Sequence, residues 1–170
     1  SHIKTWKRFL QSKAQYALIF EDDITFNPKT LHNVVSQLKT VHQLWDIVNF
    51  NTKDHKLPLN LFNLKHPYHA VIYLKPAVLA GAYLINRKAA QHLTQLALPV
   101  KEINDHFFIR SWELKTKFIG VEPRVAFQKA FVSDRIQLDQ IKTSKQTWAQ
   151  KFLIKSFKVV FVFNSSLVAE

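Results

Sequence analysis

Continuous apolar runs alternate along this chain with stretches of helical periodicity, and this alternation restricts the folds open to it. Runs that are apolar throughout are typical of strands buried on both faces. The predicted strands occupy residues 16–20, 46–50, 70–74, 81–85 and 117–121. The predicted helices occupy 31–41, 87–98 and 104–112, with a further short helix capped by Ser1. We therefore predict an α/β protein with a sheet flanked by helices.

One segment departs from the alternation. Residues 51–69 are polar and include Pro58 and Pro67. This composition predicts a loop, and its length suggests a functional one.

Composition excludes several classes of protein. The 170 residues are 47% hydrophobic, which suits one domain with a core and excludes a disordered chain. Cys is 0 and Gly is 2, which excludes thiol catalysis, cysteine-ligated zinc and glycine-rich phosphate loops. The longest uncharged apolar run, Ala77–Ile85, falls short of the roughly 20 residues that span a bilayer. Met is 0, so we interpret the chain as an internal or C-terminal piece of a longer protein.

The chain is strongly basic, with 24 Lys and Arg against 12 Asp and Glu, a formal net charge of +12 and a pI near 10.0. This balance favours polyanionic partners such as nucleic acids, anionic lipids or phosphorylated substrates. A basic nucleic-acid-binding module is therefore one alternative function. Against it, the sequence has no recognised nucleic-acid-binding motif, and Arg, which usually reads base edges, is scarce.

From Lys142 onward the composition changes to Lys and large apolar residues. On a helical wheel Lys151, Lys155 and Lys158 share one face, and the opposite face carries Leu153, Phe157, Val160 and Phe161. This pattern predicts a basic amphipathic helix on an anionic membrane. Residues 159–163, Val-Val-Phe-Val-Phe, are equally typical of a strand packed on the body of the protein. The sequence leaves both alternatives open.

Three adjacent acids, Glu21, Asp22 and Asp23, follow the first predicted strand. Ligand sites of open α/β sheets lie at the carboxyl ends of the strands, so a ligand is expected here. In extended chain Glu21 and Asp23 point to one side and Asp22 to the other. Two carboxylates on one side favour a hard divalent cation such as Mg²⁺ or Mn²⁺. We therefore predict Glu21 and Asp23 as metal ligands; a solvated turn or a helix-capping cluster is the alternative.

Five blocks of the sequence, in order, resemble glycosyltransferase family 25, the lipooligosaccharide-biosynthesis galactosyltransferase-like enzymes. The resemblance covers most of residues 1–135. Its blocks are Ser1-His2-Ile3 with Trp6; Tyr16–Phe26 around Glu-Asp-Asp; Ala80–Ile85 followed by Arg87–Ala90; Leu98-Pro99-Val100 followed by Asp105; and Val121-Glu122-Pro123 with Gln128.

The resemblance implies a GT-A-like, Rossmann-related mixed sheet and a metal-dependent, inverting transferase. The implied reaction moves a hexose, galactose or glucose, from a UDP-sugar to a lipooligosaccharide or lipopolysaccharide acceptor. In such folds the acidic motif holds Mn²⁺ or Mg²⁺ on the donor diphosphate, which assigns the metal to Glu21 and Asp23. Asp22 is expected to face the ribose or the sugar. Tyr83 is expected to contact the donor by stacking on a sugar ring, with core packing as its alternative.

An inverting transfer needs a base, usually a carboxylate, to take the proton of the acceptor hydroxyl. In the family an Asp directly follows Pro-Val, whereas here Lys101-Glu102 follow Pro99-Val100. Asp105 is our candidate for the base, and Glu102 is the second candidate. The family's N-terminal strand-helix-strand segment is also missing from the sequence. We therefore expect an N-terminally truncated fold, and an inactive truncated transferase is a further alternative.

These expectations divide the chain into two parts. We predict the C-terminal portion of a glycosyltransferase domain over residues 1–140 and a basic, membrane-associating tail over 141–170. The expected partners are a nucleotide-sugar donor, a glycolipid acceptor and an anionic membrane surface. The expected location is the cytoplasm, peripheral to the bacterial inner membrane.

Overall fold

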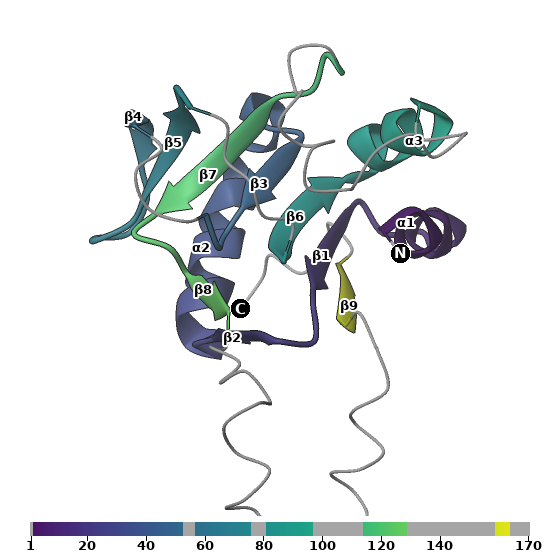
Figure 1. Cartoon of the computed structure of the whole chain (residues 1–170), viewed down its shortest axis with the longest axis horizontal. Helices are drawn as coiled ribbons and strands as arrows, with labels where there is room; N and C mark the ends of the chain where they lie inside the picture. Colours follow the sequence, from purple (N-terminus) through teal and green to yellow (C-terminus); the bar gives the residue numbers. More distant parts are fainter. Residues whose placement is uncertain (1, 53–56, 76–80, 97–113, 129–158, 164–170) are drawn as a thin grey trace, which may run out of the picture.

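The computed structural model describes residues 2–52, 57–75, 81–96, 114–128 and 159–163 (Figure 1). They form a mixed α/β structure, with helices on both faces of a central sheet. The predicted fold class is confirmed. The predicted helix at 104–112 lies outside the described residues.

The central sheet has seven strands in the order β4-β5-β7-β3-β6-β1-β9. Among these described strands, β3 and β7 are parallel neighbours and the other neighbouring pairs are antiparallel. The strands are β1 Tyr16–Phe20, β3 Ile47–Asn49, β4 Pro58–Asn63, β5 His69–Tyr73, β6 Ala82–Asn86, β7 Phe118–Glu122 and β9 Val159–Phe163. The five strands predicted from apolar runs are thus β1, β3, β5, β6 and β7, with ends that differ by at most one residue.

Three α-helices cover the described sheet. α1 (His2–Gln11) and α3 (Arg87–Leu96) pack against each other on one face, and α2 (Pro28–Thr40) covers the other (Figure 1). α2 begins three residues before the predicted start at 31, because the Asn27 side chain accepts a hydrogen bond from the Thr30 N–H and Pro28 opens the first turn. A short 3-10 helix, η1 (His42–Leu44), follows α2.

Successive side chains of the central strands enter two different cores. From β1, Leu18 and Phe20 join the apolar cluster beneath α2, whereas Ile19 joins the cluster beneath α1 and α3. β6 divides in the same way, with Leu84 in the first cluster and Ile85 in the second. Burial on both faces explains why β1 and the buried residues 82–85 of β6 are apolar at every position.

The prediction of a loop over residues 51–69 is wrong, because Pro58–Asn63 forms β4. This strand pairs antiparallel with β5, with a bulge between Asn60 and Phe62. β4 is an edge strand, and five of its six residues are exposed. Its surface position permits a Pro at the first residue and Asn within, so it lacks the apolar run that marks a buried strand.

The strand alternative is the one observed for the last described segment. Val159–Phe163 forms β9 beside β1, with Phe161 opposite Leu18. Residues 129–158, with Lys151, Lys155 and Lys158, lie outside the described part. The membrane-associating tail and the boundary between residues 140 and 141 therefore stay predictions. Within the described residues, no helix combines the length and apolar character needed to cross a bilayer.

Three strands end at the same edge of the sheet. β1 and β3 are each antiparallel to β6, and β3 is parallel to β7, so all three run in one direction. A second, two-stranded antiparallel sheet, β2 (Ile24–Phe26) with β8 (Ala126–Gln128), joins this edge. It is attached through the Ala126 N–H, which donates to the Phe50 carbonyl at 3.0 Å. The acidic triplet lies between β1 and β2 at this carboxyl edge.

Candidate functional site

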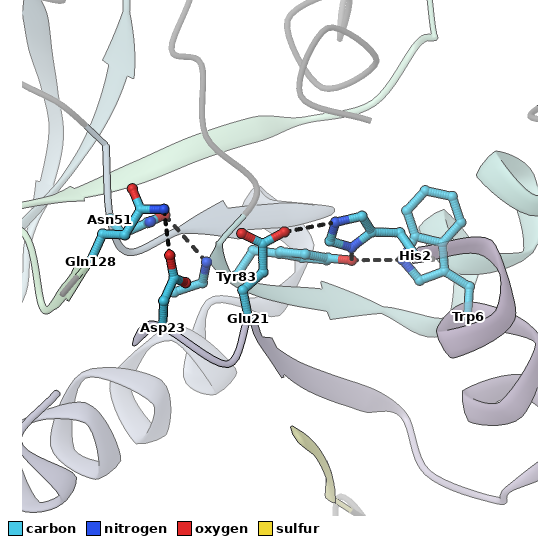
Figure 2. A network of polar contacts seen from close by, with 8 residues as sticks. His2, Trp6, Glu21, Asp23, Asn51, Tyr83 and Gln128 are labelled. Carbon is cyan, nitrogen blue, oxygen red and sulfur yellow. Dashed lines mark hydrogen bonds and ion pairs between the residues drawn. The ribbon is translucent and has the colours of Figure 1, made fainter. Parts of the chain in front are cut away.

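The acidic triplet lies in a turn. β1 ends at Phe20, and the Ile24 N–H donates to the Glu21 carbonyl at 3.3 Å. The expectation of extended chain with alternating side chains is therefore wrong here. The turn nonetheless separates the acids, because Asp22 is exposed whereas Glu21 and Asp23 are half-buried and face neighbouring elements (Figure 2).

Asp23 is held by the small second sheet. The pairing of Ile24 with Gln128 brings the Gln128 side chain to the turn, where its Nε2 donates to Asp23 Oδ2 at 2.6 Å. The other oxygen, Asp23 Oδ1, is buried and has no hydrogen-bond partner among the described residues. One oxygen of the carboxylate is thus fixed by Gln128, whereas the other makes no hydrogen bond to the described residues.

Glu21 is held by α1. Its Oε1 lies 3.5 Å from His2 Nε2, and the side chains are 33% and 2% exposed, respectively. A buried imidazole therefore orients a carboxylate that still reaches solvent at the sheet edge.

The Tyr83 hydroxyl links this histidine to a second residue of α1. Trp6 Nε1 donates to Tyr83 Oη at 2.9 Å, and His2 Nδ1 lies 2.8 Å from the same oxygen (Figure 2). With the hydroxyl donating to Nδ1, His2 presents Nε2–H to Glu21. Burial, and secondarily the charge of Glu21, raises the pKa of Tyr83 above its usual range, so the hydroxyl keeps its hydrogen. A continuous set of polar contacts thus runs from Trp6 to the Glu21 carboxylate.

A glycine allows a further polar side chain to approach the turn. A Cβ on Gly81 would lie 2.7 Å from Asn51 Nδ2, 2.9 Å from Ile24 Cδ1 and 3.4 Å from Glu21 Oε2. The Ala82 N–H donates to Asn51 Oδ1 at 3.2 Å. Asn51 is 2% exposed, and within the described part of the chain its Nδ2 has no hydrogen-bond partner. Any larger residue at position 81 would push these side chains apart.

The donor atoms at this edge suit a hard divalent cation. The described residues contain no group of three or more His, Cys, Asp or Glu that could hold a metal ion by itself. Mg²⁺ and Mn²⁺, however, are commonly bound through one or two carboxylates, with waters and substrate phosphates completing the shell. The Glu21 carboxylate and the buried Asp23 Oδ1 are ligand atoms of this kind.

The other predicted site residues lie in different surroundings. Asp105 and Glu102 are outside the described residues. Asp22 is exposed at the turn. The Tyr83 side chain is buried, with the residue 1% exposed, which matches its alternative prediction of core packing. Its contact with a donor stays a prediction.

Two surface hollows lie near the opposite edge of the sheet. One, of about 510 Å³, is lined in part by Asp46, Lys88 and His92, and the other, of about 390 Å³, in part by Asp46, Lys88 and Lys117. Asp46 accepts hydrogen bonds from Asn86 Nδ2 and the Lys117 N–H, both at 2.9 Å, which is a structural role. Neither hollow includes a residue of the acidic triplet.

Residues 1–108 match the sequence model of glycosyltransferase family 25, described as an LPS biosynthesis protein. The chain belongs to glycosyltransferase family 25. The matched segment is more than half of the 170 residues and contains Glu21, Asp23, Tyr83 and both candidate bases. The family points to a glycosyltransferase of lipopolysaccharide biosynthesis. Among curated proteins, none matches the chain significantly.

Blocks that resemble family 25, though far apart in the sequence, meet in two sets of polar contacts on either side of the acidic turn. His2 and Trp6 come from the first block, Glu21 and Asp23 from the second, Tyr83 from the third and Gln128 from the last. In the sequence, His2 and Gln128 are visible only as parts of these blocks, and Asn51 belongs to none of them. The spacing of His2 and Trp6, one helical turn apart, signals a shared face, but the role of Asn51 depends on the distant Gly81 and Ala82.

Proposed function

We propose that this protein is a metal-dependent, inverting glycosyltransferase that moves galactose or glucose from a UDP-sugar to a lipopolysaccharide or lipooligosaccharide acceptor. The observation that supports it best is the pair Glu21 and Asp23, each held by a side-chain nitrogen at the carboxyl edge of the sheet. This edge is where ligands of open α/β sheets bind. The pair also lies within the segment that matches family 25.

Glu21 and Asp23 would hold Mn²⁺ or Mg²⁺ together with the donor diphosphate. Such an ion, when bound, acts as a Lewis acid that offsets charge on the leaving diphosphate. His2 and Gln128 keep the two carboxylates oriented before the ligand arrives, so less order has to be created on binding. Asp22, at the exposed side of the turn, faces the ribose or sugar.

The acceptor hydroxyl must lose a proton as its oxygen attacks the anomeric carbon from the face opposite the diphosphate. Glu21 and Asp23 are committed to the diphosphate side, so another carboxylate takes this proton. We assign that role to Asp105 and keep Glu102 as the second candidate. Because the acceptor is a glycolipid, the enzyme works at the cytoplasmic face of the bacterial inner membrane as a peripheral protein.

The first test is calorimetric binding of UDP-galactose and UDP-glucose, with and without Mn²⁺, to wild type and to the double variant Glu21→Ala/Asp23→Ala. The double variant should lose Mn²⁺-dependent binding while its circular dichroism is unchanged. Asp134→Ala/Asp139→Ala removes the same charge outside the matched segment and should bind as wild type does. Unchanged metal-dependent binding in the Glu21/Asp23 variant, or no binding by wild type, contradicts the proposal.

The second test concerns the base. Asp105→Asn should lower kcat by at least about 10²-fold, the low end for general-base catalysis, and leave donor affinity intact. If the variant melts earlier but turns over normally, Asp105 serves the fold, and Glu102→Gln becomes the next variant.

A further inference from the structure

Asn51 presents a buried hydrogen-bond donor, Nδ2, for which the residues that the structure describes offer no acceptor. The residue is 2% exposed, and its Oδ1 accepts from the Ala82 N–H at 3.2 Å. This bond fixes the orientation of the amide, because a flipped amide would set two donors against each other. Nδ2 therefore faces away from the Ala82 N–H, and no described residue pairs with it. Buried polar groups are normally paired, so an unpaired one points to a ligand or a bound water.

A buried acceptor without a partner belongs to the same site. Asp23 Oδ1 is buried and unpaired, while its Oδ2 is occupied by Gln128. Figure 2 shows Asn51, Asp23 and Gln128 gathered on one side of Glu21, with His2, Tyr83 and Trp6 on the other. Glu21 Oε2 and Asn51 Nδ2 both lie against the space above Gly81, so this amide group and the acidic turn share one boundary.

The two unpaired atoms, Asn51 Nδ2 and Asp23 Oδ1, together favour one kind of ligand group. A group that serves both must accept one hydrogen bond and donate another, which is what a hydroxyl does. A phosphate oxygen only accepts, so it would serve Asn51 Nδ2 but supply no hydrogen to Asp23 Oδ1, which would then be paired by the cation alone. A hydroxyl therefore suits this position better than the diphosphate does.

We propose that Asn51 and Asp23 bind a hydroxyl of the sugar nucleotide, with Asn51 Nδ2–H donating to the hydroxyl oxygen and the hydroxyl hydrogen directed to Asp23 Oδ1. The assignment rests on the proposed function, because the donor supplies the hydroxyl. Asp23 Oδ1 has two lone pairs, so a hydrogen bond and a cation can share it. Access comes from the side of Glu21, whose side chain borders Asn51 above Gly81 and is 33% exposed. The ribose and the transferred sugar both carry hydroxyls, and the experiment separates them.

The test pairs Asn51→Asp, which keeps the size and the Oδ1 acceptor for the Ala82 N–H but removes the donor and adds a negative charge, with Asn51→Ala, which removes the donor without adding charge. The loss described below must appear in both variants, and circular dichroism checks that each of them folds. Calorimetry should show about tenfold weaker UDP-glucose binding, the cost of one such hydrogen bond. Asn60→Asp makes the same change on exposed β4 and should bind as wild type does. Equal losses for UDP and UDP-glucose assign the hydroxyl to the ribose, and a loss confined to UDP-glucose assigns it to the sugar. Wild-type affinity for both ligands in Asn51→Asp overturns the proposal.

A second measurement uses wild-type protein, so it does not depend on the variant folding. The Asn51 side-chain amide resonances, followed by ¹⁵N–¹H NMR, should shift as UDP-glucose saturates the protein. Resonances that stay in place at saturation show that a water alone pairs Asn51, and they overturn the hydroxyl assignment while leaving the transferase proposal standing. A wild type that binds no UDP-sugar overturns both.

Discussion

The Tyr83 hydroxyl joins residues that lie far apart in the chain. It contacts Trp6 Nε1 and His2 Nδ1, which are 77 and 81 positions away in the sequence. A phenylalanine ring would fill the same space in the core, so the function of the hydroxyl is to pair these buried nitrogens. Through His2 it also helps to orient Glu21.

Tyr83→Phe should therefore destabilise the protein although it removes one atom. Two buried nitrogens lose a partner, and we expect the free energy of unfolding to fall by about 1–3 kcal/mol. Urea denaturation measures the change. Tyr68→Phe, at the half-buried margin of the core, is the control and should change stability by less than about 0.5 kcal/mol. Equal midpoints for Tyr83→Phe and wild type would contradict the network.

The same variant should alter the response to alkaline pH. Burial is the main reason that the pKa values of Tyr83 and Tyr73 are raised, so the unfolded chain releases these protons first as the pH rises above about 10. The unfolded state then binds fewer protons than the native state, and stability present below pH 10 is lost above it. Tyr83→Phe should lose stability less steeply between about pH 10 and 11 than wild type. If the free energy of unfolding falls equally steeply with pH in Tyr83→Phe and in wild type, Tyr83 contributes nothing to this loss.

At the scale of elements, Arg87 connects the first residue of α3 to the end of α1. Its Nε donates to the Ala14 carbonyl at 2.7 Å and its Nη1 to the Leu10 carbonyl at 3.2 Å, and Nη2 contacts the carbonyls of Phe9 and Ser12. Carbonyls at a helix end have no partner within the helix, so a planar guanidinium satisfies several of them at once. This contact fixes α1, which carries the His2 that orients Glu21.

Arg87→Lys should loosen α1, because a single ammonium group cannot reach all of these carbonyls. We expect a loss of about 1–3 kcal/mol in the free energy of unfolding and faster amide hydrogen exchange in α1 than in α2. Lys88→Ala changes the exposed neighbouring residue and is the matched control. Exchange in α1 that is equally slow in both variants would assign its position to apolar packing alone.

At the scale of the whole molecule, the predicted tail and the sheet overlap. β9 lies within residues 141–170 and pairs with β1, so deleting the tail would remove a strand together with the lysines. A test of membrane binding must therefore keep residues 159–163 and change only charge.

The triple variant Lys151→Gln/Lys155→Gln/Lys158→Gln meets this requirement. Each Lys near an anionic surface contributes about 1 kcal/mol, so sedimentation with phosphatidylglycerol vesicles should weaken on the order of a hundredfold. Added salt should reduce binding of the wild type in the same direction. Lys4→Gln/Lys7→Gln/Lys13→Gln removes the same charge from three exposed positions in and after α1 and serves as control. If both triple variants lose binding equally, net charge and not the tail attracts the protein to the membrane.

The sequence predicted the elements whose pattern is local. β1 and residues 82–85 of β6 are apolar because both of their faces are covered, and the chain therefore shows them as continuous runs. The same reasoning located the acidic triplet at a strand end, and the order of five blocks was enough to suggest family 25. β4 was not predicted from the sequence, because an edge strand is largely exposed to solvent and its composition therefore resembles that of a loop.

The tertiary structure alone decided which polar groups meet. Helical spacing places His2 and Trp6 on one face of α1, but only the packing of α1 on β6 brings that face to Tyr83. The register of β2 and β8 brings Gln128 to Asp23. Because Gly81 has no Cβ, the Asn51 side chain can lie beside Glu21. A hydrogen bond depends on the relative position of two groups to within a fraction of an ångström. Apolar periodicity records only whether a position is buried, so this sequence determined the layers of the fold, and three-dimensional packing determined the contacts of the site.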